Sequence, residues 1–68
     1  MAMEIILNGK EKTISPDLNI EKLLEQLKVN PLTVVIELNL DILDKNKYNR
    51  ITLKENDKVE IVHFVGGG

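Results

Sequence analysis

Residues 3–14 read MEIILNGKEKTI, and this stretch decides how the chain begins to fold. Before Asn8-Gly9, Met3, Ile5 and Leu7 alternate with Glu4 and Ile6, as in a strand that buries one face, and a second strand-like run, residues 10–14, follows the pair. Asn-Gly is the preferred pair at the centre of a type I′ turn, because both central residues of that turn need positive φ. The stretch therefore predicts a β-hairpin.

A helix is predicted after this hairpin, with Asn19 as its N-cap. Ser15-Pro16-Asp17 ends the second strand, because proline has no amide hydrogen to give to a ladder. Leu18 and Leu23 have the spacing of a hydrophobic staple, and Asn30-Pro31 is expected to end the helix. One apolar stripe, suited to covering one sheet, has the spacing i, i+3, i+4, i+7 in Ile20, Leu23, Leu24 and Leu27.

The second half of the chain predicts further strands. Residues 33–38 are rich in β-branched side chains and are expected to form the most buried strand. Residues 39–47 predict a short edge strand and an irregular connection, and residues 51–53 a brief strand. A turn at 55–58 leads into the last strand, residues 59–64. This order predicts an α+β fold, a mixed sheet of four to five strands with one main helix packed across one face.

The composition excludes several classes of protein. The chain has 68 residues, 43% of them hydrophobic, which favours a packed domain over a disordered segment. Its net charge is -2, and its lysines are spread among acidic residues, so we expect no nucleic-acid partner. No apolar run approaches the roughly 18 residues of a membrane helix, and the start of the chain lacks a signal-peptide pattern. We therefore expect no membrane contact and a cytoplasmic location.

The inventory of reactive side chains is too small for a catalytic site. The chain has one histidine, His63, one serine, Ser15, and no cysteine, whereas a nucleophile needs an oriented base beside it. Asp41 and Asp44 are the nearest candidates for a metal site, but they lack the spacing of a calcium loop. We expect no catalytic residue, no metal and no cofactor bound by the chain itself.

The chain ends in Gly66-Gly67-Gly68, which divides it into a domain of residues 1–65 and a flexible tail of residues 66–68. Glycines add nothing to packing and are costly to order, so they are either a frayed terminus or a segment with a use. Without Cβ atoms, Gly66 and Gly67 can thread a narrow channel and present the Gly68 carboxylate to a distant active site. Adenylation with ATP would activate that carboxylate, and a persulfide could then convert it to a thiocarboxylate.

The chain resembles the ThiS family of thiamin-pathway sulfur carriers across nearly its whole length. The resemblance is carried by residues 3–10 (MEIILNGK), 23–27 (LLEQL), 34–39 (VVIELN), 56–65 (NDKVEIVHFV) and the final glycines. It implies a ubiquitin-like β-grasp fold and a non-enzymatic role. It also implies adenylation of Gly68 by a ubiquitin-activating-like enzyme of the ThiF type, which consumes ATP. Sulfur would then come from a cysteine-desulfurase persulfide and pass to a thiazole synthase of the ThiG type.

The sequence departs from the common family pattern at a few loop and edge positions. Leu40 follows Asn39 where a glycine is usual, and Asp44-Lys45 replaces a frequent Pro-Arg. Tyr48 stands where tryptophan is often seen, and Asn56 replaces a glycine. These differences bear on the contacts with partners rather than on the fold.

Strand alternation also predicts a docking surface for those partners. One set of side chains should face the helix: Met3, Ile5, Leu7, Val34, Ile36, Leu38, Val59 and Ile61. The opposite face is then left with an apolar docking patch made of Ile6, Val35, Val62 and Phe64. The alternatives are that another segment or another copy of the chain covers these residues, or that they are scattered exposed side chains.

Three other functions remain open at this stage. The small subunit of molybdopterin synthase uses the same carrier chemistry and also ends in Gly-Gly, although its relatives are usually longer and carry prolines before the tail. A ubiquitin-like modifier would join Gly68 to a lysine through an isopeptide bond. A plain interaction module would make no use of the glycines.

Overall fold

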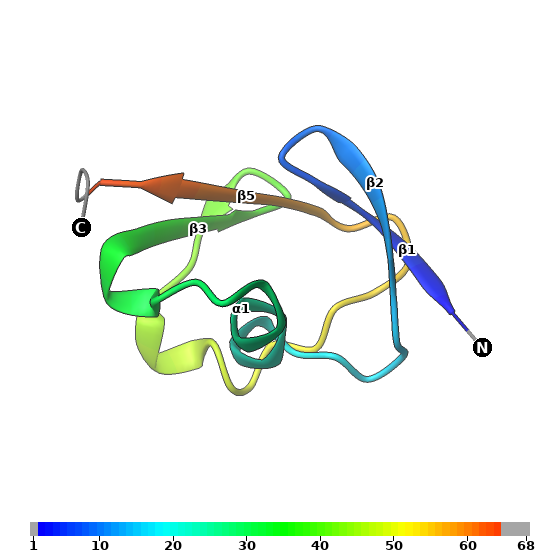
Figure 1. Cartoon of the computed structure of the whole chain (residues 1–68), viewed down its shortest axis with the longest axis horizontal. Coiled ribbons are helices and arrows are strands. Elements are labelled where there is room, and N and C mark those ends of the chain that lie inside the picture. Colours follow the sequence, from blue (N-terminus) through cyan, green and yellow to red (C-terminus); the bar gives the residue numbers. More distant parts are fainter. Residues whose placement is uncertain (1, 65–68) are drawn as a thin grey trace.

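A computed structural model describes residues 2–64 of the chain (Figure 1). It contains one five-stranded sheet in the order β2-β1-β5-β3-β4, with one α-helix, α1 (Ile20–Leu27), across one of its faces. The pair β1–β5 is parallel and the other pairs are antiparallel. The predicted mixed sheet with a single helix, the β-grasp arrangement, is therefore confirmed. Its strands are β1 (Met3–Leu7), β2 (Lys10–Ile14), β3 (Val34–Leu38), β4 (Asp41–Ile42) and β5 (Lys58–His63).

The predicted hairpin forms between β1 and β2. Its central residues Asn8 and Gly9 have φ values of 49° and 82°, as a type I′ turn requires. The same turn also binds β5, because the Asn8 amide donates to the Val59 carbonyl at 2.9 Å and its side-chain oxygen accepts from the Ile61 amide at 2.8 Å. The turn thus continues the β1–β5 pairing past the end of β1.

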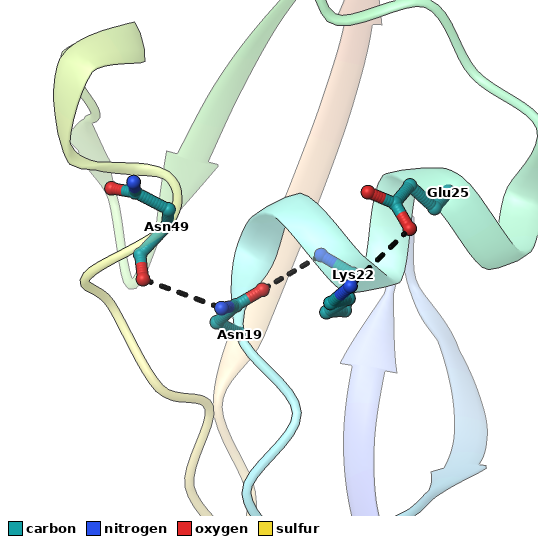
Figure 2. A network of polar contacts seen from close by, with 4 residues as sticks. All are labelled: Asn19, Lys22, Glu25 and Asn49. Carbon is teal, nitrogen blue, oxygen red and sulfur yellow. Dashed lines mark hydrogen bonds and ion pairs between the residues drawn. The ribbon is translucent and has the colours of Figure 1, made fainter.

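Helix α1 begins where the sequence predicts. The side-chain oxygen of Asn19 accepts from the Lys22 amide at 2.7 Å, which confirms the N-cap, and its side-chain nitrogen donates to the Asn49 carbonyl at 3.3 Å (Figure 2). Lys22 also forms an exposed ion pair with Glu25 at 3.7 Å. The Asn19 side chain therefore pairs an amide of the first turn that has no partner within the helix, and it links the helix to the segment before residue 51.

The helix ends earlier than the sequence predicts. Lys28 adopts a left-handed conformation with φ 58°, and its amide donates to the Glu25 carbonyl, so the helix stops at Leu27. The prediction that Asn30-Pro31 ends the helix was wrong. Asn30 instead caps a 3-10 turn, η1 (Pro31–Thr33), by accepting a hydrogen bond from the Leu32 amide.

The core lies between α1 and the inner face of the sheet. The side chains predicted to face the helix are all either buried or packed against the buried cluster. Tyr48 and Leu53, from the connection between β4 and β5, close the same core. The fully enclosed side chains are Ile5, Ile20, Leu23, Leu24, Val34, Ile36, Leu53 and Val59.

The segment between β3 and β5 is mostly irregular, as predicted. Its edge strand is limited to β4, and a second 3-10 turn, η2 (Lys45–Lys47), follows. Residues 51–53 do not form a strand of the sheet, because Thr52 makes only an isolated bridge to Asn19. Residues 2–64 hold no helix with the length and apolar character needed to cross a membrane.

Candidate functional site

The final strand β5 leads directly to the C-terminal residues. The predicted carrier residue Gly68 and the threading residues Gly66 and Gly67 lie outside the described residues. The last described residue is Phe64, whose amide donates to the Thr33 carbonyl at 3.2 Å. The chain therefore approaches its tail along a central strand, beside the beginning of β3.

The end of β5 carries exposed apolar side chains on the sheet face opposite α1. Val35 and Val62 are directly opposite each other in the β3–β5 register, and Phe64 follows two residues later, in line with Val62. Val62 is 46% exposed and Phe64 is 55% exposed, whereas Val35 is half-buried between its neighbours. The structure thus brings three of the four predicted docking residues together.

The fourth residue, Ile6, lies further along the same face. It is level with Lys58, four residues before Val62, which corresponds to about 13 Å along the strand. Glu60 lies between Lys58 and Val62 on this face of β5. Ile6 is half-buried and is not contiguous with the other three side chains.

Sequence reasoning missed a further apolar residue on this face, Ile42 of β4. It lies opposite Glu37 in the β3–β4 register and is 71% exposed. The signal was present in the sequence, because continuing the alternation of β3 through a two-residue turn at 39–40 places Ile42 on the outer face. We call the side chains of Val35, Ile42, Val62 and Phe64 the outer patch.

A pair of acidic residues interrupts the outer patch. Glu37 and Glu60 are directly opposite each other in the β3–β5 register, two residues along the strands from the Val35–Val62 pair and on the same face. Within residues 2–64 the one ion pair joins Lys22 and Glu25 on α1, so neither of these carboxylates has a basic partner there. The surface around the outer patch therefore combines apolar side chains with two carboxylates.

Lys45 supports the end of β5 from the edge of the sheet. Its ammonium donates to the Val34 carbonyl at 2.8 Å and lies 5.4 Å from the centre of the Phe64 ring. Asp44, which caps η2 by accepting from the Asn46 amide at 3.0 Å, fixes the backbone just before Lys45. A cation over an aromatic face is attractive, so Lys45 helps to hold the Phe64 ring.

Tyr48 follows η2, and its amide donates to the Lys45 carbonyl at 3.2 Å. Its hydroxyl is buried and has no hydrogen-bond partner of good geometry among the described residues, although the Ile36 backbone is close enough to affect it. Burial raises the pKa of Tyr48, the Ile36 backbone lowers it, and the negative charge of Asp44 raises it further. The net effect is a pKa above the usual value of 10.0.

A groove of about 340 Å³ opens on the helix side, between α1, η1 and η2. Its floor is apolar and its rim carries the carboxylates of two α1 residues. The residues that line the groove include Glu21, Leu24, Glu25, Val29, Leu32 and Tyr48. In the described part of the chain, no group of three or more His, Cys, Asp or Glu side chains is placed to hold a metal.

Comparison with known proteins identifies the family to which this fold belongs. The ThiS family model matches residues 5–68. The chain belongs to the ThiS family. It is 40% identical over 63 residues to the sulfur carrier protein ThiS of Bacillus subtilis, covering 91% of this chain and 96% of that protein. The crystal structure of a ThiS thiamine biosynthesis protein from Geobacter metallireducens matches with a TM-score of 0.85 and 38% identity, covering 97% of this chain and 100% of that one.

Some relatives of this ThiS-family chain are much longer proteins. A thiazole synthase of Paramagnetospirillum magneticum is 39% identical over 66 residues, which cover 97% of this chain. A thiazole synthase of Magnetococcus marinus is 36% identical over the same length. The chain spans only 20% of the length of each. A segment similar to this chain is therefore part of a larger polypeptide in these organisms.

Proposed function

We propose that this chain is a sulfur carrier whose C-terminal Gly68 becomes a thiocarboxylate and donates sulfur for the thiazole ring of thiamin. The observation that carries the proposal is the ThiS family match, which covers residues 5–68. The similarity to the Bacillus subtilis sulfur carrier over most of both chains supports the same role.

The proposed chemistry takes place on the Gly68 carboxylate. That carboxylate attacks the α-phosphorus of ATP and pyrophosphate leaves, which gives an acyl adenylate. The outer sulfur of a persulfide then displaces AMP from the acyl carbon, and a thiol reduces the resulting disulfide to release the thiocarboxylate. In this chemistry the chain supplies the carboxylate and acts as a co-substrate of other enzymes.

Three partners follow from this chemistry. An adenylyltransferase of the ThiF type would activate Gly68, a cysteine desulfurase or another persulfide donor would supply sulfur, and a thiazole synthase of the ThiG type would consume it. The long relatives support the last of these, because a ThiS-like segment lies within proteins named thiazole synthase. Gly66 and Gly67 would extend into each active site.

The outer patch would provide the folded contact that such partners need. Ordering three glycines costs on the order of 3–6 kcal/mol, so the tail alone would bind a partner weakly. Burying an apolar side chain contributes roughly 1.5–3 kcal/mol before association costs, and two residues of the patch, Val62 and Phe64, lie in the segment that leads into the tail. An enzyme that holds the tail is therefore well placed to cover Val62 and Phe64.

Intact mass spectrometry tests the proposed function. The full chain and a Gly68 deletion are each incubated with a ThiF-type enzyme, ATP, cysteine and a cysteine desulfurase. We expect one oxygen to be replaced by one sulfur in the full chain only. An unchanged mass with competent enzymes would refute the carrier role, and attachment to protein lysines instead would indicate a modifier.

The substitution Val62→Asp tests the role of the outer patch. Val62 is half exposed, so we expect the variant to fold and its adenylation to be weakened. Thr13→Asp is the control, because Thr13 is exposed on β2, two strands away from β5. Adenylation of the Val62 variant at the rate of the control would rule out docking through the patch.

A further inference from the structure

The acidic pair on the outer face has a fixed geometry. Glu37 and Glu60 lie directly opposite each other on adjacent antiparallel strands, where Cβ atoms are separated by about 4.5–5.5 Å. Apolar side chains flank the pair, with Val35 and Val62 on one side and Ile42 opposite Glu37 on β4. Two carboxylates thus stand within an exposed apolar surface.

This arrangement does not stabilise the domain. Like charges placed directly opposite each other on a sheet are destabilising. Within the described residues neither carboxylate forms an ion pair, and Lys58, two residues before Glu60 on the same face, is not within ion-pair distance of either. Neither side chain makes a hydrogen bond among those found in residues 2–64, unlike the acidic side chains of Asp44, Glu55 and Asp57.

The pair limits what can cover the outer patch. A partner that buries Val35 and Val62 must also remove water from Glu37 and Glu60, because these four residues form neighbouring pairs on the outer face, separated only by the inward-facing Ile36–Ile61 pair. Burying a carboxylate without a partner is strongly unfavourable, and burying two adjacent ones is worse. A purely apolar or acidic surface is therefore excluded as the occupant.

An arginine side chain meets this requirement. Its planar guanidinium has five N–H donors and can bind two carboxylates at once, which a single ammonium does with less geometric precision. We infer that the enzyme which adenylates Gly68 places an arginine between Glu37 and Glu60 while apolar side chains around it cover Val35, Val62 and Ile42. This inference rests on the proposed function, because it specifies the surface of the enzyme that acts there.

The contact would also affect the rate of association. Opposite charges on two docking surfaces accelerate their encounter, and salt weakens this effect. Binding of the chain to its activating enzyme should therefore become weaker as salt concentration rises. Removing the acidic pair should reduce this dependence on salt.

The decisive variant is the double substitution Glu37→Gln and Glu60→Gln. Its matched control is Glu21→Gln with Glu25→Gln, which changes the net charge equally but lies on α1, across the sheet from the outer patch. Titration calorimetry without ATP measures the Kd of each chain for a purified ThiF-type adenylyltransferase at low and high salt. Thermal unfolding is measured in parallel.

We expect the double variant to bind on the order of tenfold to a hundredfold more weakly at low salt, with a smaller salt dependence. Its Tm should equal or exceed that of the unmodified chain, because a repulsive pair has been removed. The control should keep the original Kd. Weaker binding together with unchanged or higher stability is a result that a merely structural role would not give.

Two results would overturn the inference. One is an unchanged Kd for the double variant, and the other is an equal loss in the control, which would indicate a general charge effect. Adenylation of Gly68 is assayed separately with ATP. If the unmodified chain binds but is not adenylated, the proposed function fails while the Kd comparison still decides the role of the acidic pair.

Discussion

The two hairpins of the sheet use the same kind of turn but differ in its second residue. The β1–β2 turn has Asn8 and Gly9 at φ 49° and 82°, and the β3–β4 turn has Asn39 and Leu40 at φ 51° and 75°. The first hairpin has five paired positions and the second has two. Leu40 is 86% exposed, so burial does not offset the unfavourable conformation of its backbone.

Tertiary contacts explain how the second turn forms without a glycine. The Asn39 side chain accepts from the Lys58 amide at 2.9 Å and donates to the Asp57 carboxylate at 3.0 Å. Its backbone amide also donates to the Lys58 carbonyl at 2.8 Å. Asn8 makes one side-chain bond of this kind, to the Ile61 amide. A turn that local sequence disfavours is thus held by the neighbouring strand.

The largest effect is expected for Asn39→Ala. The variant loses two side-chain hydrogen bonds and forces alanine into a left-handed conformation, so we expect a loss of about 2–3 kcal/mol in unfolding free energy. Asn8→Ala, which loses one such bond, should cost about 1.5–2 kcal/mol. Urea denaturation measures both, and equal losses would contradict the stronger anchoring of the second turn.

The glycine variants Asn39→Gly and Asn8→Gly separate the two causes. Glycine accepts the left-handed conformation, so only the side-chain hydrogen bonds are lost. The difference between the alanine and glycine variants should then be similar at the two sites. A much larger difference at one site would mean that backbone strain, and not anchoring, distinguishes the turns.

Lys45→Met tests why the second hairpin is short. On the edge of β3, the Ile36 carbonyl accepts a hydrogen bond from the Leu43 amide. The next carbonyl on that edge, that of Val34, accepts from the Lys45 ammonium, where a longer β4 would otherwise pair with it. Methionine keeps the aliphatic stem but has no donor, so we expect a loss of about 1–1.5 kcal/mol. Lys47→Met, on the same 3-10 turn, is the control and should change little.

Exchanging the second residue of each turn tests the backbone strain directly. Gly9→Leu should cost about 1 kcal/mol through backbone strain alone, because a Cβ at Gly9 meets nothing within 4 Å. Leu40→Gly should stabilise the fold by about 0.5–1 kcal/mol for the same reason. If thermal unfolding shows that Leu40→Gly is destabilising, the exposed leucine has a stabilising contact that outweighs its backbone strain.

The smallest effect is expected at Tyr48, whose buried hydroxyl lies near the Ile36 backbone of β3. Its raised pKa means that the folded state keeps the phenol proton at a pH where the unfolded chain has begun to lose it. Stability should therefore be complete below pH 10.0, and fall as pH rises through the folded-state pKa. Tyr48→Phe should remove this decline and change stability by less than about 1 kcal/mol at neutral pH. Urea midpoints across the alkaline range compare the two chains.

The elements with strong local signals were predictable. Asn8-Gly9 specifies its turn, and Asn19 with the apolar spacing after it specifies the start of α1, because each depends on neighbouring residues only. The end of α1 was not predictable, since Lys28 adopts a left-handed conformation that lysine does not favour. The expected strand at 51–53 became a single bridge because residues 19 and 52 meet through the fold.

The candidate site was predictable only in part. Alternation placed Val35, Val62 and Phe64 on one face, but the distance of Ile6 depends on the register between β1 and β5. That register joins the two ends of the chain, and no local pattern specifies it. The pairing of Glu37 with Glu60 depends in the same way on how β3 and β5 align.

The sequence by itself determined the order of the elements, the faces of the strands and the glycine ending, because these follow from periodicity, turn chemistry and composition. Tertiary structure alone decided which residues meet: Lys45 with Phe64, Asn39 with Lys58, and Glu37 with Glu60. The physical reason is that strand register and side-chain contacts between distant segments are set by packing of the whole core. A turn as unfavourable as Asn39-Leu40 persists because those contacts stabilise it.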